Sequence, residues 1–352
     1  MKKLAAWFND RLGLQAISAF MTKKEVPQHK HTMWYYTGSS ILLFMGIQFV
    51  TGIMLALYYK PTLEGANASV GHIMTEVPLG WIVRSVHSLS ASCMIAIVMV
   101  HLVAILLTKS YRKPREMTWM SGVILLVCSM GFGFTGYLLP WDDLSLAATK
   151  VGTNIPKAIP FIGDWAVKFL RGGEDVTGDT LTRFFIFHVC VLPLVLLLVL
   201  AFHFFVIQRH GISVPLEAEI KKEKVRSLPF FPNFVLRESL VWIVLLGCLV
   251  TAAVLFAPSL GPAANLMAPA PEGIQPEWYF LFLFQTLKIF PANILVITGE
   301  ALAVFLILIA VVLIFFLPLI DTKPSEKKGK VITVVAYLGL AYAVAMTVWS
   351  LL

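Results

Sequence analysis

Charged residues are scarce in this sequence. Only 14% of its 352 residues are Asp, Glu, Lys or Arg, whereas 58% are hydrophobic, and the mean hydropathy is +0.80. A soluble globular domain is roughly a quarter charged, so a large soluble core does not explain the deficit. The chain is therefore expected to lie in a lipid bilayer.

Cysteine is scarce too, and its placement excludes two kinds of redox centre. The four cysteines form no C-x-x-C or C-x-x-C-H pattern, which argues against an iron–sulfur cluster or a c-type haem in this chain. All four fall inside apolar runs, where they are expected to be small core residues: Cys93, Cys128, Cys190 and Cys248. A signal peptide is not expected either, because the first twenty residues mix apolar with charged positions.

Long apolar runs are abundant. Each of seven runs has about the 20 residues that a helix needs to cross a membrane: 37–58, 81–108, 117–139, 184–207, 239–257, 296–319 and 331–351. Backbone groups find no water in lipid, so each run should be helical, and the alternation typical of a β-barrel is missing. The predicted fold class is all-α: a polytopic membrane bundle of about seven helices, four followed by three.

The basic residues indicate topology rather than a nucleic-acid partner. The net charge is +8, but most of the Lys and Arg residues lie in the N-terminal segment and in alternate loops, all on one predicted side. This is the positive-inside pattern. The N-terminus is therefore expected on the cytoplasmic, or inner, side, with the C-terminus on the opposite, outer side.

The pattern divides the chain into four predicted parts. Residues 1–30, with Leu4, Trp7, Phe8, Leu12 and Phe20, resemble an amphipathic helix on the inner surface; a disordered tail is the alternative. A four-helix domain (31–210), an inner linker (211–236) and a three-helix domain (237–352) follow. Two outer loops, 140–183 and 258–291, are long enough to suggest function.

Four histidines carry the strongest chemical signal. His87 and His101 lie fourteen residues apart in the second run, and His188 and His203 lie fifteen apart in the fourth. At 100° and 1.5 Å per residue, each pair shares roughly one helix face and is separated by about 21 Å along the axis. Because both helices run inward, the two pairs match in depth. They predict two bis-histidine iron sites stacked across the membrane.

The alternatives explain this pattern less well. A single histidine of this kind is more often a core residue, but four ionisable side chains paired by depth inside a membrane are usually functional. A zinc ion would need ligands that converge on one point. The pattern therefore favours two non-covalently bound b-type haems.

Glycines and arginines fit the same interpretation. Gly38 and Gly52 in the first run, and Gly122 and Gly136 in the third, are also fourteen residues apart. They would leave room for a flat macrocycle, although small residues also simply let helices approach closely. Arg84 and Arg183 lie near the outer helix ends, where they could bind haem propionates or serve as topology anchors.

Three motifs resemble the cytochrome b family of quinol–cytochrome c oxidoreductases. They are RSVHSLSASCMIAIVMVH, GYLLPWDD and PEWY. The seven runs and the fifteen-residue spacing are similar to the chloroplast type, there split into two polypeptides but here in one chain. The resemblance implies that His87 and His188 bind the low-potential haem near the outer side. It likewise assigns His101 and His203 to the high-potential haem near the inner side.

The resemblance also implies two quinone sites. Glu277 is expected in an apolar loop, where burial raises the pKa of a carboxyl group. By resemblance it takes a proton from quinol, and Tyr279 borders the quinol ring at an outer site. The mitochondrial type has a quinone-binding histidine where this chain has Gln208, followed by Arg209 and His210. Glu238 stands where that branch has an acidic residue of the inner quinone site.

The implied activity is that of a membrane-bound quinol–cytochrome c (or plastocyanin-like acceptor) reductase. Quinol gives one electron to a Rieske-type iron–sulfur subunit and one to the haems, which pass it to the inner quinone site as protons cross the membrane. A c-type cytochrome subunit, a homodimer of the complex and a bacterial cytoplasmic membrane are also expected. Tyr35 and Tyr36 stand where the chloroplast type has a haem-bearing cysteine, so no covalent haem is predicted.

Two rival functions remain open on the sequence alone. A dihaem membrane anchor of a dehydrogenase or hydrogenase would also carry intramembrane histidines, but it needs neither PEWY nor long outer loops. A secondary transporter with structural histidines would show no b-type absorption band.

Overall fold

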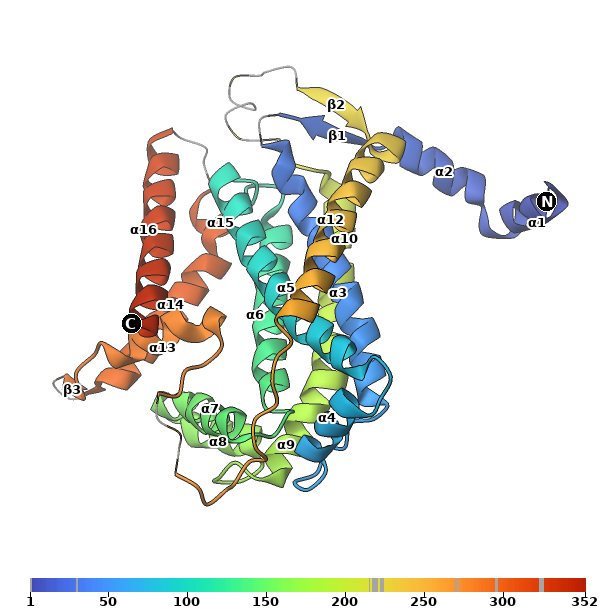
Figure 1. Cartoon of the computed structure of the whole chain (residues 1–352). Helices are drawn as coiled ribbons and strands as arrows, with labels where there is room; N and C mark the ends of the chain where they lie inside the picture. Colours follow the sequence, from blue (N-terminus) through green and yellow to red (C-terminus); the bar gives the residue numbers. More distant parts are fainter. Residues whose placement is uncertain are drawn as a thin grey trace.

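The computed structural model describes residues 2–29, 31–214, 216, 221, 225–269, 271, 273–294, 297–322 and 326–352. Much of the predicted linker at 211–236 therefore lies outside the described residues. The described parts are mostly helical, which confirms the predicted all-α fold class. Figure 1 shows a bundle of long helices with short elements gathered at its two ends.

Within the described residues, six helical spans are long and apolar enough to cross a membrane. They are Thr32–Ala56, Gly80–Thr108, Glu116–Tyr137, Gly178–His210, Phe230–Leu255 and Lys330–Leu351. These contain the main bundle helices α3 (Tyr35–Ala56), α5 (Gly80–Thr108), α6 (Glu116–Tyr137), α10 (Leu192–His210), α12 (Val235–Leu255) and α16 (Glu326–Leu351). Six of the seven predicted runs thus form spans of full length.

The remaining run, 296–319, forms a shorter helix than predicted. The helix α14 covers Gly299–Phe315, and α15 (Leu317–Ile320) follows with Pro318 in its first turn. Proline lacks the N–H that would continue a helix, which accounts for the break. The 17 residues of α14 span about 26 Å, slightly less than the hydrocarbon core of a typical bilayer.

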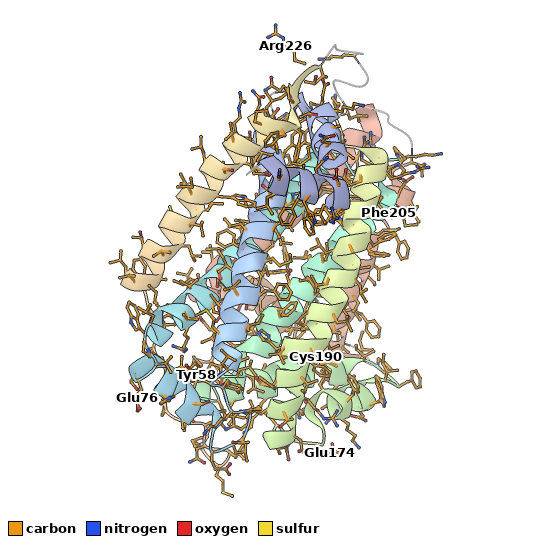
Figure 2. All side chains as sticks on the ribbon, turned by 90° about the vertical axis from the view of Figure 1, so that its right-hand side faces the viewer. Tyr58, Glu76, Glu174, Cys190, Phe205 and Arg226 are labelled. Atoms are coloured by element: carbon orange, nitrogen blue, oxygen red, sulfur yellow. The ribbon has the colours of Figure 1, made fainter. Side chains whose placement is uncertain are left out.

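The outside of the bundle is apolar between two polar ends. Phe205 and Leu198 of α10 are each more than 60% exposed, as are Ile243 and Leu338 on other helices. Figure 2 shows Arg226 at one end, Glu76 and Glu174 at the other, and Cys190 and Phe205 between them. Exposed apolar surface of this extent marks a membrane-facing exterior, so the chain is an integral membrane protein.

One end of the bundle holds the N-terminal elements, and we call it the inner end, after the predicted topology. Here the strand β1 (Glu25–Gln28) pairs antiparallel with β2 (Arg226–Pro229) and joins two distant parts of the chain. The amphipathic segment predicted at residues 1–30 forms α1 (Lys2–Leu12) and α2 (Leu14–Lys23). These helices extend away from the bundle in Figure 1.

The opposite, outer end holds the two long loops. The first contains α7 (Asp143–Asn154), η2 (Ile155–Ala158), α8 (Gly163–Arg171) and α9 (Gly178–Ile186). The second contains η5 (Trp278–Phe280) and α13 (Leu281–Lys288), with β3 (Asn293–Ile294) and β4 (Ile297–Thr298) after it. The short helix α4 (Ala66–Thr75) also lies at this end. The first predicted loop is therefore largely helical, and the second becomes helical only from Trp278 onward.

The two loops are bonded to each other. The backbone of Ala264 donates to the carbonyl of Trp141 at 2.9 Å, and Asn265 donates to the Asp143 carboxylate at 2.8 Å. Asp142 caps α7 and forms a β-bridge with Ala263. The second loop, which leads to Glu277, is thus fixed on the turn that follows α6.

Candidate functional site

The four histidines share one hydrogen-bonding pattern. Each imidazole Nδ1 lies within 3.1 Å of a hydroxyl oxygen on the neighbouring helix. The pairs are His87 with Thr51, His101 with Thr37, His188 with Thr135 and His203 with Ser121. A hydrogen bond to one ring nitrogen orients the ring and assigns the other nitrogen to a metal. The pattern therefore leaves Nε2 of each ring available to a metal ion.

Each of the four predicted glycines faces one of these rings. A Cβ atom built on Gly38, Gly52, Gly122 or Gly136 would meet the Cε1 atom of His101, His87, His203 or His188 at 3.6, 3.2, 3.5 and 2.6 Å, respectively. Any larger residue at Gly136 would therefore displace the His188 ring. The four glycines thus leave room for the imidazole rings, in addition to the room they leave between the helices.

The hydroxyl residues were not foreseen, although the sequence carries a signal for them. Thr37, Thr51, Ser121 and Thr135 each stand immediately before one of the four glycines, so they repeat the same fourteen-residue period. One turn of α3 or α6 thus supplies both a hydroxyl and a gap to one histidine. A search for a serine or threonine directly before each of the four regularly spaced glycines would have identified these hydroxyl residues.

The spacing of the outer pair fits a bis-histidine haem. The ring centroids of His87 and His188 are 6.3 Å apart. Two metal–nitrogen bonds of about 2 Å, with roughly 1 Å from each nitrogen to its ring centre, span about 6 Å. The two imidazoles, the distance between their centroids and the space left by the facing glycines therefore all fit a haem between His87 and His188.

The unequal spacing of the histidines has a local cause. His188 lies in one π-helical turn, Phe187–Val191, in which the Leu192 N–H bonds to the Phe187 carbonyl. A π-turn takes up one additional residue in a helix, and such turns are frequent at functional sites. The extra residue between His188 and His203 is absorbed there, so both histidines still match their partners in depth.

The two arginines are bound to backbone carbonyls of the outer loops. Arg84 donates to Pro258 O at 2.6 Å and to Ser259 O at 3.2 Å, while Arg183 donates to Phe169 O at 2.9 Å. Each lies near the outer histidine of its helix, as the sequence predicted. In this arrangement both side chains hold the loops that cover the outer end.

Glu277 and Tyr279 lie against the outer end of α6. Tyr279 is 5% exposed, and its hydroxyl contacts the Cα position of Gly133, where a side chain would collide with it. Glu277 is partly buried, and burial raises the pKa of its carboxyl group. Burial, followed by the charge of Glu277, also raises the pKa of the Tyr279 phenol. The site therefore pairs a carboxyl group able to take a proton with a phenol that stays protonated.

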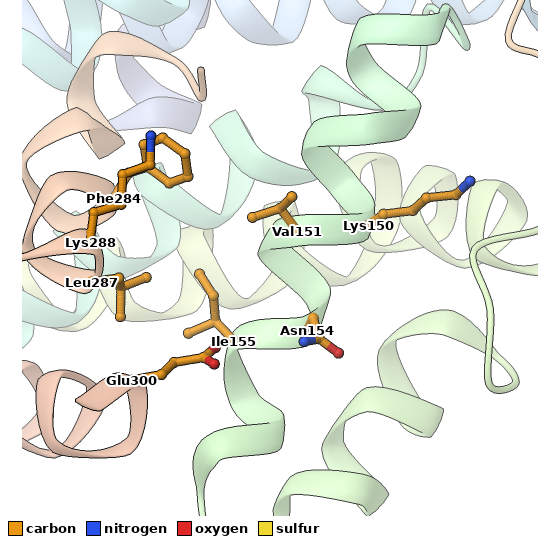
Figure 3. Close-up of a pocket in the computed structure, with 8 residues that line it drawn as sticks. All are labelled: Lys150, Val151, Asn154, Ile155, Phe284, Leu287, Lys288 and Glu300. Carbon is orange, nitrogen blue, oxygen red and sulfur yellow. The ribbon is translucent and has the colours of Figure 1, made fainter. Parts of the chain in front are cut away.

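A cavity of about 430 Å³ lies between α7, α13 and α14 (Figure 3). It is lined by Lys150, Val151 and Asn154 of α7, Ile155 of η2, Phe284, Leu287 and Lys288 of α13, and Glu300 of α14. Because α13 directly follows Tyr279 and Phe280, the same segment forms the Glu277 site and one wall of the cavity. Its size is that of a small-molecule site.

The residues predicted for an inner quinone site come from two helices. Gln208 lies near the end of α10, where its amide oxygen accepts a hydrogen bond from Lys24 at 3.1 Å. The backbone carbonyl of His210 accepts from Arg115 at 3.5 Å, and the Arg209 side chain is exposed. Glu238 lies in the first turn of α12. Lys24 was not foreseen, because it is 184 residues from its partner.

Comparison with known proteins agrees with this geometry. Residues 21–211 match the family model described as Cytochrome b/b6/petB, and residues 263–351 match Cytochrome b(C-terminal)/b6/petD. A cytochrome bc complex cytochrome b subunit from Chlorobaculum thiosulfatiphilum is 44% identical over 98% of this chain and 80% of its own length.

Two further relatives resemble a part and the whole of the chain. Cytochrome b6 from Crocosphaera subtropica is 45% identical over 61% of this chain and 96% of its own length. A solved structure titled Hyperthermophilic respiratory Complex III superposes with a TM-score of 0.81, at 26% identity, over 98% of both chains. The chain therefore belongs to the cytochrome b family, in the form that joins the cytochrome b6 part and the petD-like part in one polypeptide, as a cytochrome b subunit of a bc-type complex.

Proposed function

We propose that this subunit oxidises quinol at the outer end and reduces quinone at the inner end, with two non-covalent b-type haems between the two sites. The supporting observation is the fourfold pattern of hydroxyl, histidine and glycine. His87 and His188 would hold the outer haem, and His101 and His203 the inner haem. When bound, the haems supply one-electron transfer between the two quinone sites.

Glu277 and Tyr279 act at the outer site. Oxidation of quinol releases two electrons and two protons. A carboxyl group whose pKa is raised toward the working pH accepts such a proton efficiently and can pass it to water. The Tyr279 phenol remains a hydrogen-bond donor and borders the quinol ring.

The complex around the subunit follows from the same proposal. The chain holds no iron–sulfur or c-type haem motif, so a separate Rieske-type subunit would take one electron from quinol and pass it on to a c-type cytochrome, while the other electron enters the haems. The cavity at α7 and α13 would face the first of these partners. We also propose a homodimer in a bacterial cytoplasmic membrane, with the N-terminus inside, and the domain division at residues 31–210 and 237–352.

The experiment that tests this proposal uses the purified complex with its inner site blocked. If quinol electrons divide at the outer site, adding an oxidised acceptor together with quinol should cause reduction of the b-type absorption band. Reduction by quinol that is independent of the acceptor would contradict the division and would favour the dihaem anchor of a dehydrogenase. The absence of any b-type band would reject haem binding altogether.

A further inference from the structure

We infer that Lys24 is a binding residue of the inner quinone site, where its ammonium group donates a hydrogen bond to a quinone carbonyl. This inference rests on the proposed function, because it assumes that quinone is reduced at the inner end. Nothing in the sequence singles out Lys24, which is one of two adjacent lysines at the end of α2.

The contacts of Lys24 place it beside the end of α10. Its ammonium donates to the Gln208 amide oxygen at 3.1 Å and lies 5.0 Å from the centre of the Phe230 ring. Gln208 is five residues beyond His203, which corresponds to about 7.5 Å along the helix. The ammonium group therefore lies about one and a half helical turns from the proposed inner haem ligand, on its inner side.

The backbone around Lys24 is fixed, so this position is built into the fold. The Phe230 N–H donates to the Lys24 carbonyl at 2.8 Å, and the β1–β2 pairing starts at the next residue, with Glu25 opposite Pro229. Phe230 in turn stacks on Phe234, which stacks on Tyr36 of α3 at 4.9 Å. Lys24 thus borders an aromatic wall that connects to the first bundle helix.

The ammonium group has unused bonding capacity. It carries three N–H donors, and among the described residues only Gln208 accepts one of them. No carboxylate of the described chain lies within ion-pair distance of Lys24. Burial without a counter-ion lowers the pKa of Lys24, which makes the group a better proton donor.

The chemistry of quinone reduction matches such a group. Adding two electrons and two protons to a quinone converts both carbonyl oxygens into hydroxyl groups, and negative charge develops on oxygen until the protons arrive. A cationic donor beside an aromatic wall favours that charge, while the ring face accepts the flat quinone. An anionic lipid headgroup is the competing ligand, but the flanking rings favour a flat, aromatic-like molecule.

Three variants of the intact complex test the inference. Lys24→Met removes the charge and keeps the length of the side chain, Lys24→Arg keeps the charge, and Lys23→Met is the matched control on the adjacent exposed lysine. The measurement is the rate at which quinone re-oxidises the inner haem, as a function of quinone concentration. For Lys24→Met, we expect the half-saturating quinone concentration to rise at least tenfold, the loss typical of one charge-assisted hydrogen bond.

The controls separate this inference from the proposed function. Haem spectra and the acceptor-induced haem reduction by quinol, measured with the inner site blocked, should be unchanged in all three variants, and Lys24→Arg should recover part of the quinone affinity. Wild-type re-oxidation kinetics in Lys24→Met would overturn the inference, as would loss of bound phospholipid with normal kinetics. If the wild-type complex itself fails to reduce quinone at the inner haem, the proposed function fails instead.

Discussion

Each of the four paired histidines contacts a hydroxyl group and faces a glycine. The closest approach is at Gly136, where a methyl group would lie 2.6 Å from the His188 Cε1 atom. Helix α6 contributes this glycine directly after Thr135, which bonds to the same ring. Position and orientation of the imidazole are therefore set by two consecutive residues.

Gly136→Ala should displace His188 and reduce the content of the outer haem to less than half. In a helix interior, alanine is otherwise favoured over glycine by roughly 1 kcal/mol, so a loss would reflect the collision. The measurement is the haem-to-protein ratio, together with the two spectral components. Gly46→Ala is the matched control, because a Cβ atom there meets nothing within 4 Å. Equal haem content in both variants would show that the contact between Gly136 and His188 does not control haem binding.

Glu277→Gln should leave both haems bound and slow quinol oxidation at least tenfold, in line with typical general-base contributions. A protonated carboxyl group cannot accept a proton, so the wild-type rate should fall as the pH drops through the pKa of Glu277. Because burial raises that pKa, the fall should begin above the ordinary glutamate value of about 4.3. The pH–rate profile measures this. A glutamine variant with wild-type turnover and the same profile would mean that Glu277 only shapes the loop.

At the scale of the element, the apolar runs predict the bundle helices because the lipid environment requires internal backbone bonding. The matched spacing of the histidines and the glycines likewise predicts which faces of neighbouring helices pack together, because residues at this spacing lie on one face of a helix. Other features depend on long-range packing. The Tyr279–Gly133 contact and the Lys24–Gln208 bond join residues that no local pattern connects. The break after Phe315 could have been foreseen from Pro318.

The π-turn at Phe187–Val191 leads to a prediction about residue deletion. Removing Val189 shortens the turn to an ordinary helix with a fourteen-residue histidine spacing, as in α5, so both haems should stay bound. Removing Leu197 gives the same spacing but keeps the π-turn, which rotates His203 by about 100° relative to His188. Both residues face outward, at 41% and 47% exposure. Haem content and spectra should then differ between the two variants, and identical losses would contradict this account of the turn.

At the scale of the whole molecule, one buried cluster joins the histidine-bearing helices to the C-terminal helices at the inner end. Arg112 donates to the Asp321 carboxylate through Nε at 2.9 Å and Nη2 at 2.6 Å, and the Tyr111 hydroxyl donates at 2.8 Å. Asp321 is 3% exposed. The nearby indole of Trp119 donates to Ile314 O at 2.7 Å.

Asp321→Leu should destabilise the subunit by about 3–5 kcal/mol, because it leaves the Arg112 charge buried without its partner. Replacing both residues, as Arg112→Met with Asp321→Leu, should recover most of that loss, since a well-packed apolar pair avoids the desolvation cost. Denaturant unfolding of the four members of this double-mutant cycle, followed by haem absorbance, measures the coupling. Additive effects of the two single changes would show that the pair contributes nothing specific.

The hydroxyl–histidine–glycine pattern also determines how the bundle can be assembled. Helices α3 and α5 pack as one antiparallel hairpin and α6 packs along α10 as another, and each hairpin contains two histidines with their hydroxyl and glycine neighbours. Neither hairpin holds both histidines of either pair, so each haem of the proposed function would cross-link two equivalent units. Without haem, only direct helix contacts such as those between α5 and α6 would hold the two hairpins together.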